Sequence, residues 1–127
     1  MNYRHRTESI DYDAWYSVID MFKNKNDTNI LKFIKYFKNQ FEDSHKIILS
    51  NHEYGILNLN TTFNIESEFS YLIILCIKNN GNLILNNSEE KILLEERHIY
   101  TIRLSNISVF NIDPIDNKIF TYIIIRT

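Results

Sequence analysis

The apolar run Tyr71–Ile77, "YLIILCI", limits most strongly how this chain can fold. It is too short to cross a bilayer, which takes about 20 residues as a helix. Its isoleucine, leucine and tyrosine residues suit the pleated surface of a β-strand. A strand that is apolar at successive positions is typically buried on both faces. We therefore expect this segment to be a strand covered on both sides.

Length and composition indicate a single domain that spans residues 1–127. The chain has 127 residues, 44% of them apolar and 24% charged, which is ordinary for a globular protein with its own core. Its formal net charge of −2 indicates no attraction to nucleic acid or to an anionic membrane. We therefore expect neither of these partners.

The single cysteine and the first residues of the sequence indicate a reducing compartment. Cys76 lies inside the apolar run, where a buried and inert thiol is expected, and no second cysteine can form a disulfide with it. The first residues, "MNYRHRTESIDYD", contain no apolar segment of the kind found in a signal peptide. We expect a cytoplasmic protein.

Two amphipathic helices are predicted between about residues 11 and 44. Asp11 or Asp13 can cap the first helix, and Asp27 or Thr28 can cap the second. Each helix has apolar residues at helical spacing: Trp15, Val18, Ile19 and Phe22 in the first, and Ile30, Phe33, Ile34, Phe37 and Phe41 in the second.

Short strands separated by turn residues are predicted over about residues 46–126. Their spacing of roughly eight to twelve residues is typical of antiparallel sheets and barrels. We expect an α+β fold in which two N-terminal helices precede a mostly antiparallel sheet that can curl into a small barrel.

The segment Ser88–His98, "SEEKILLEERH", is open to two interpretations. A helix there would carry only a narrow apolar stripe. A hairpin would pair Leu83 and Leu85 with Ile92 and Leu94, and would place the charged residues in turns. We favour the hairpin, and the helix stays the alternative.

The strand pattern of about residues 69–127 carries a resemblance to a known family. It runs through "YLIILCIKNNG", "NLILNNSEE", "KILLEERHIYTIRL" and "ISVFNIDPIDNKIFTYIII". This succession resembles the cupin-like small jelly roll of the N-terminal sensing domains of AraC-type transcription regulators. The resemblance implies an effector-sensing or dimerisation domain, which can form a homodimer. It also implies an apolar pocket lined by residues such as Leu72, Ile74, Leu83, Leu85 and Ile102.

The sequence departs from that family in three ways. The usual Gly-Asp turn between the middle strands is replaced by Glu96-Arg97-His98. The His-x-His and Glu set of metal-binding cupins is missing, since only His98 lies in this region. The residues up to Thr127 contain no counterpart of the helix-turn-helix units that follow the sensing domain in these regulators. With these departures, the resemblance implies a sensing or dimerisation module that lacks both the metal site and the DNA-binding units.

No pattern of residues points to catalysis or to a cofactor. The histidines His5, His45, His52 and His98 match no zinc-ligand spacing. There is no G-x-S-x-G elbow, and two glycines leave no phosphate-cradling loop. We expect no enzyme activity, no cofactor and no metal. The lysines of the helices, including Lys32, are interpreted as a solvated face.

Acidic side chains and tyrosines suggest a surface that binds a protein. Tyrosine beside acidic residues is typical of such surfaces, and acidic clusters can cover a basic active site. Our candidate partner-binding residues are Asp11, Asp13, Tyr16, Glu89, Glu90, Glu95 and Glu96. We hypothesise a non-catalytic inhibitor, namely an immunity-type protein that neutralises a cognate bacterial toxin by direct binding to a basic toxin domain. The alternative is the effector-sensing or dimerisation domain.

Overall fold

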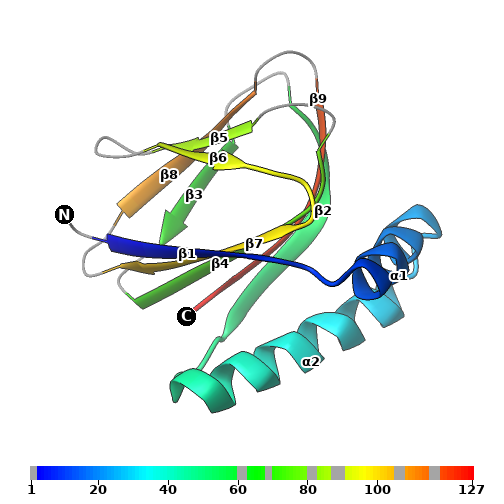
Figure 1. The fold of residues 1–127 in the computed structure, drawn as a ribbon, viewed down its shortest axis with the longest axis horizontal. Coiled ribbons are helices and arrows are strands. Elements are labelled where there is room, and N and C mark those ends of the chain that lie inside the picture. Colours follow the sequence, from blue (N-terminus) through cyan, green and yellow to red (C-terminus); the bar gives the residue numbers. More distant parts are fainter. Residues whose placement is uncertain are drawn as a thin grey trace.

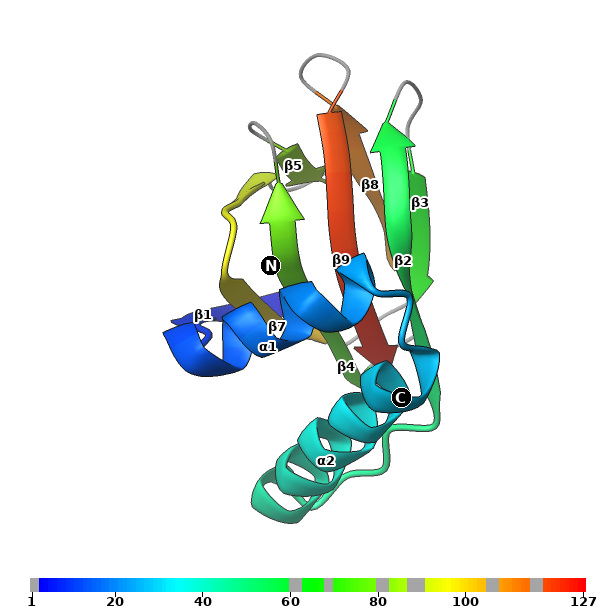
Figure 2. The same ribbon diagram turned by 90° about the vertical axis from the view of Figure 1, so that its right-hand side faces the viewer.

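The protein consists of two stacked antiparallel sheets with two helices on the outer face of the larger sheet (Figure 1). The structure is a computed structural model that describes residues 3–59, 63–67, 70–79, 83–86, 91–104, 108–114 and 118–127. The smaller sheet, the larger sheet and the helices form three successive layers. Figure 2 looks onto the helical layer, where α1 crosses in front of β4 and β9.

The larger sheet has five strands in the order β1-β7-β4-β9-β2, and the smaller has four in the order β3-β8-β5-β6. The strands of the larger sheet are β1 (Tyr3–Ser9), β2 (Asn51–Leu59), β4 (Ser70–Asn79), β7 (His98–Leu104) and β9 (Lys118–Arg126). Those of the smaller sheet are β3 (Phe63–Ser67), β5 (Leu83–Asn86), β6 (Lys91–Leu94) and β8 (Ser108–Pro114).

The strand pairing is nested around the β5–β6 hairpin. Moving outward along the chain, β4 pairs with β7, β3 with β8, and β2 with β9, alternately in the two sheets. A chain folded back on itself and rolled in this way forms a jelly roll. The predicted α+β class with antiparallel strands is confirmed. Hydrogen-bonded pairing does not close the described strands into a barrel.

Strand β4 is buried on both faces, as predicted. Every residue of 72–77 is 0% exposed. Side chains alternate between the faces of a strand, so successive residues enter different cores. Leu72, Ile74 and Cys76 belong to the cluster between the sheets, whereas Ile73 and Leu75 belong to the cluster beneath the helices.

The two predicted helices are present as α1 (Tyr12–Lys23) and α2 (Asp27–His45). Asp11 caps α1, since its carboxylate accepts from the N–H groups of Asp13 and Ala14 at 3.2 and 3.5 Å. The predicted cap of α2 was wrong by at least one residue. Asn26 caps it, accepting from the Asn29 N–H at 3.2 Å. Neither helix of the described chain is long and apolar enough to span a membrane.

Strand β1 was not predicted, and it places a strand before the helices. It pairs antiparallel with β7 and forms one edge of the larger sheet, with Thr7 opposite Tyr100 and Ser9 opposite His98. Its sequence "YRHRTES" lacks the alternation of apolar residues that marks a half-buried strand. Backbone pairing with β7 therefore defines this strand.

The segment Ser88–His98 contains a strand, so the favoured interpretation is confirmed for its described residues. In the β5–β6 pair, Leu83 lies opposite Leu94 and Leu85 lies opposite Ile92. Residues 87–90 lie outside the described part of the chain, and with them the candidates Glu89 and Glu90. After β6 the chain does not form a second hairpin; it crosses to the larger sheet and begins β7.

We expect substitution of Leu75 by alanine to destabilise the fold strongly. Leu75→Ala leaves a cavity in a fully buried position, which typically costs about 3 kcal/mol of unfolding free energy. The matched control is Leu93→Ala, because Leu93 on β6 is 46% exposed; its cost should stay below about 1 kcal/mol. Urea denaturation measures both, and equal costs would contradict the two-sided burial of β4.

Candidate functional site

Hydrogen bonds join the turn between β6 and β7 to the chain at the start of α1. The Ile10 N–H donates to the Arg97 carbonyl at 2.9 Å, and the Arg97 Nη1 donates to the Ile10 carbonyl at 2.6 Å. The Arg97 guanidinium carbon also lies 3.9 Å from the centre of the Tyr12 ring. This distance suits a cation–π interaction. Two segments that are far apart in the sequence thereby form one surface.

Arg97 adopts a backbone conformation that usually favours glycine. Its φ is 67°, in the left-handed region. This conformation costs a residue with a side chain roughly 1–2 kcal/mol. The hydrogen bond and ring contact of its side chain offset that cost, and its N–H donates to the Cys76 carbonyl at 2.8 Å. The resemblance implied a Gly-Asp turn, and an arginine takes the left-handed position instead.

The rest of the turn is also held by hydrogen bonds. The Glu95 N–H donates to the Tyr100 hydroxyl at 2.6 Å, and the Asn79 N–H donates to the Glu96 carboxylate at 3.0 Å. The Nδ1 of His98 lies 2.8 Å from the Glu96 carbonyl, which can only accept, so Nδ1 donates. The turn therefore has a defined shape.

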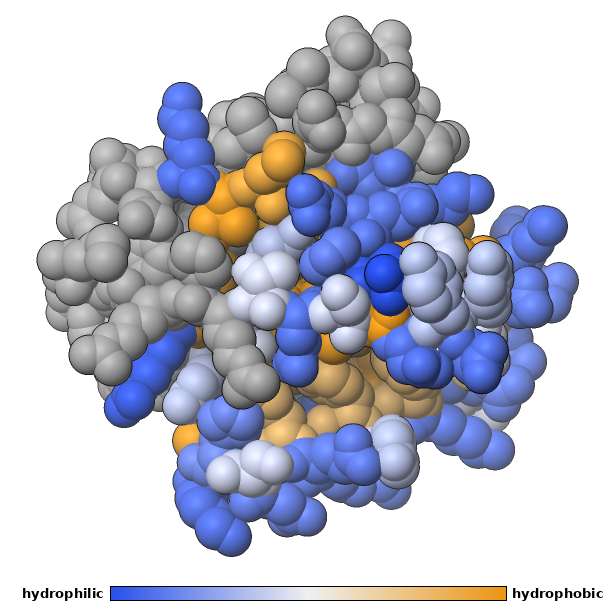
Figure 3. All heavy atoms as spheres, viewed as in Figure 1, coloured by the Kyte–Doolittle hydropathy of each residue, from blue (hydrophilic) through white to orange (hydrophobic). Residues whose placement is uncertain are grey.

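Three aromatic rings cluster at the start of α1. Tyr12 and Tyr16 are each 58% exposed. Their ring centres lie 6.4 Å apart, and the Trp15 ring lies 6.3 Å from Tyr12 and 5.0 Å from Tyr16. The Trp15 Nε1 donates to the Ile77 carbonyl at 2.6 Å, which anchors the cluster to β4. Residues of intermediate hydropathy, drawn in pale colours, are among those exposed at the side of the molecule where α1 lies (Figure 3).

The structure brings together four of the seven candidate partner-binding residues. Tyr16 follows Tyr12 by one turn of α1 and Asp13 by three residues, Asp11 precedes that helix, and Glu95 is exposed in the adjoining turn. We call these five residues the acid–tyrosine surface: Asp11, Tyr12, Asp13, Tyr16 and Glu95.

Of the three remaining candidates, Glu89 and Glu90 lie outside the described part of the chain, and Glu96 lies in the turn between β6 and β7. The Glu96 carboxylate is half-buried and is bound to the Asn79 N–H, so it has a structural role in the turn.

Sequence reasoning named Tyr12 among the tyrosines that can be exposed on a protein-binding surface but left it out of the candidate set, and it missed Arg97. The spacing of Tyr12 and Tyr16 by one helical turn was a usable signal for Tyr12. No local pattern identifies Arg97, because its role depends on a contact across the fold.

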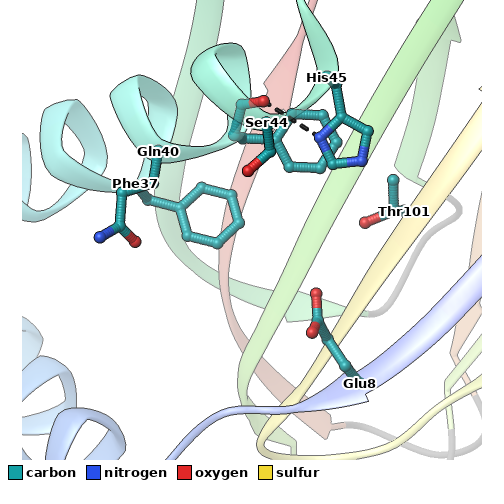
Figure 4. Close-up of a pocket in the computed structure, with 7 residues that line it drawn as sticks. Glu8, Phe37, Gln40, Ser44, His45 and Thr101 are labelled. Atoms are coloured by element: carbon teal, nitrogen blue, oxygen red, sulfur yellow. Dashed lines mark hydrogen bonds between the residues drawn. The ribbon is translucent and has the colours of Figure 1, made fainter.

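A hollow of about 250 Å³ lies between α2 and the strands β1 and β7 (Figure 4). The tan and orange colours of hydrophobic residues are visible in it in Figure 3, between α2 and the sheet above. Its walls are formed by Glu8, Phe37, Gln40, Phe41, Ser44, His45 and Thr101. Phe37 and Phe41 belong to the predicted apolar stripe of the second helix, and both are half-buried walls of this hollow.

A second hollow, of about 410 Å³, lies against α2 and has a different charge. It is lined by Leu31, Ile34, Lys35, Lys38, Asn39, Glu42, Leu49 and His52. The Glu42 carboxylate accepts from the Leu49 N–H at 2.7 Å. Lys35 and Lys38 place positive charge at the opening of this hollow.

The described part of the chain offers few side chains suited to metal binding or to nucleophilic catalysis. No group of three or more His, Cys, Asp or Glu side chains there could hold a metal ion. Burial, with a smaller contribution from the charge of Glu96, raises the pKa of the Cys76 thiol well above its usual value. The thiol is therefore protonated and poorly nucleophilic.

Comparison with protein-family models, with curated proteins and with solved structures finds no match to this chain. The resemblance to AraC-type sensing domains therefore stays a prediction.

Two substitutions separate the backbone of Arg97 from its side chain. Arg97→Gly and Arg97→Ala both remove the guanidinium, but only glycine adopts a positive φ without a steric cost. We expect Arg97→Ala to be less stable than Arg97→Gly by about 1 kcal/mol. Urea denaturation of the two variants measures this difference, and equal stabilities would show that the position does not need a left-handed residue.

Stability should fall at alkaline pH because of Tyr100. Burial is the main cause that raises the pKa of Tyr100 to about 12, whereas an exposed tyrosine has a pKa of about 10. The unfolded chain then loses its proton first, so stability is lost as the pH rises from about 10 to about 12.

The variant Tyr100→Phe should lose less stability than the parent over this interval, as measured by urea denaturation at several pH values. Part of the loss should remain, because burial also raises the pKa of Tyr122. Tyr36→Phe, at an exposed position on α2, should behave like the parent. Parallel pH profiles for parent and Tyr100→Phe would contradict the assignment.

Proposed function

We propose that this chain is a non-catalytic, immunity-type inhibitor that neutralises a cognate bacterial toxin by binding it through the acid–tyrosine surface. The observation that carries the proposal is the contact of Arg97 with Ile10 and Tyr12. It holds the exposed Tyr12 ring, whose centre lies 6.4 Å from that of the exposed Tyr16 ring, and both tyrosines follow Asp11 closely in the sequence. Tyrosines held in this way lose little entropy on binding, and they are common among the residues that dominate interface energies.

The charges around the tyrosines favour a basic partner. Asp11, Asp13 and Glu95 carry three exposed carboxylates in these two segments, against the one guanidinium of Arg97. The whole chain has a formal net charge of −2. Complementary charge accelerates association and selects among partners more than it adds affinity. A nuclease-like toxin, whose active site is basic because it binds phosphates, fits this surface.

A pull-down from the native host, with the tagged chain as bait and mass spectrometry as readout, tests the proposal. We expect a single partner in a one-to-one complex that is weakened by salt. Tyr16→Ala and Asp13→Asn should each weaken the complex, the first by about tenfold or more, as expected for an interface hot spot.

Matched controls are available on α2. Tyr36 is 63% exposed and Asp43 is also exposed, and neither belongs to the acid–tyrosine surface. Tyr36→Ala and Asp43→Asn should therefore bind the partner as the parent does. Equal losses for the α1 and α2 variants, or a complex strengthened by salt, would overturn the proposal.

The nested strand pairing favours a second candidate function, an effector-sensing or dimerisation domain. The nested pairing supports this candidate, because the sequence resemblance implies a small jelly roll. Three of the residues expected around an effector pocket, Leu72, Ile74 and Ile102, are buried in the cluster between the sheets. The side chains of Leu83 and Leu85 lie outside the described part.

A sensing domain should melt at a higher temperature when a small apolar ligand binds between the sheets. A dimerisation domain should elute as a homodimer whether or not a toxin is present. A monomer with an unchanged melting temperature would remove this second candidate.

A further inference from the structure

We propose that the hollow between α2 and the strands β1 and β7 binds a small planar organic cation, such as an aromatic amidine. The flat body of the ligand lies against Phe37 and Phe41, and its N–H groups donate to acceptors on the surrounding walls. The proposal concerns a different place from the acid–tyrosine surface, and it does not depend on the inhibitor function.

Three aromatic rings form the wall that α2 contributes to the hollow. Phe37, Phe41 and His45 follow one another at intervals of four residues on one side of the helix. The ring centres of Phe37 and Phe41 lie 6.3 Å apart at 23°, and those of Phe41 and His45 lie 3.9 Å apart at 10°. Tyr71 meets Phe41 edge-on at 5.6 Å. The faces of aromatic rings attract cations.

His45 is oriented so that it offers an acceptor. Its Nδ1 lies 3.1 Å from the Phe41 carbonyl, shown as a dashed line in Figure 4. Because a carbonyl oxygen only accepts, the proton must be on Nδ1, and in the neutral ring Nε2 is left as the acceptor. Figure 4 shows this second nitrogen on the side of Thr101.

The other polar walls are also rich in acceptors. The Gln40 amide nitrogen donates to the Tyr36 hydroxyl at 2.7 Å, which leaves its amide oxygen for a ligand. Glu8 reaches in from β1 (Figure 4). Glu8 already interacts within the chain, but a carboxylate has two oxygens and can accept from several donors. Acceptors around flat rings are complementary to a planar cation with several N–H groups.

The size of the hollow limits the ligand to about one ring. Its volume of about 250 Å³ is below the range of roughly 300–1,000 Å³ that is usual for drug-sized ligands. The other hollow against α2, with Lys35 and Lys38 on its rim, should instead repel a cation. The two hollows thus provide an internal comparison on the same helix.

Three probes of nearly identical shape test the proposal: benzamidine, benzamide and benzoate, which are cationic, neutral and anionic. Amide signals in ¹H–¹⁵N spectra of the full chain report where each probe binds. We expect benzamidine to shift the signals of Glu8, Thr101 and the end of α2 at millimolar concentrations. Its dissociation constant should be at least about tenfold lower than that of either other probe.

A matched pair of variants tests the role of charge. Glu8→Gln keeps the shape of the side chain and should weaken benzamidine binding about fivefold to tenfold, while benzamide binding stays unchanged. Glu53→Gln removes an exposed carboxylate from β2, the opposite edge of the sheet, and should change neither. His52→Ala alters the second hollow and should also leave benzamidine binding intact.

Three kinds of result would overturn the proposal. The first is a failed comparison of the probes, in which benzoate binds as tightly as benzamidine or none of the lining amides responds to benzamidine. The second is that Glu8→Gln and Glu53→Gln weaken binding equally, which would indicate general attraction to an acidic protein. The third is that the shifts map to residues 11–16 and 95–98, which would place the cation on the acid–tyrosine surface instead.

Discussion

The burial of β4 on both faces is the constraint on which the rest of the structure depends. One face of β4 holds the helices, and the other face holds the smaller sheet. The strand also pairs with β7 and β9, so it fixes the centre of the larger sheet. Its backbone also contacts the residues beside the acid–tyrosine surface, since the Cys76 carbonyl accepts from the Arg97 N–H and the Ile77 carbonyl accepts from the Trp15 Nε1. A rigid core is thereby connected to an exposed surface by short hydrogen bonds.

Hydrophobic periodicity was enough to predict the elements that bury apolar side chains. The stripes of α1 and α2 and the continuous run of β4 each carry their own period, so both the type and the approximate bounds of these elements followed from the sequence. The alternation in "KILL" likewise identified the register of β5 with β6, because Ile92 and Leu94 face the core while Leu93 is exposed. The clustering of Asp11, Asp13 and Tyr16 needed only the helix.

Features held by backbone or long-range contacts could not be predicted in the same way. Strand β1 contributes backbone hydrogen bonds to an edge and has no apolar alternation to reveal it. The division into two separate sheets depends on the crossing after β6, which local patterns do not encode. Glu96 appeared equivalent to Glu95 in the sequence, yet its carboxylate turns toward the Asn79 N–H. Arg97 has a glycine-like backbone conformation, and only the fold brings its side-chain partners Ile10 and Tyr12 near it.

The contact between Arg97 and Tyr12 joins α1 and the β6–β7 turn into one surface. A double-mutant cycle tests it most directly, with Arg97→Gly, Tyr12→Ala and the double variant compared by unfolding free energy. The glycine variant keeps the left-handed backbone, so the cycle isolates the contact between the two side chains. We predict a favourable coupling of about 0.5–1 kcal/mol, as expected for an exposed cation–π pair. Additive effects, with a coupling within about 0.3 kcal/mol of zero, would contradict the claim that this contact holds the two segments together.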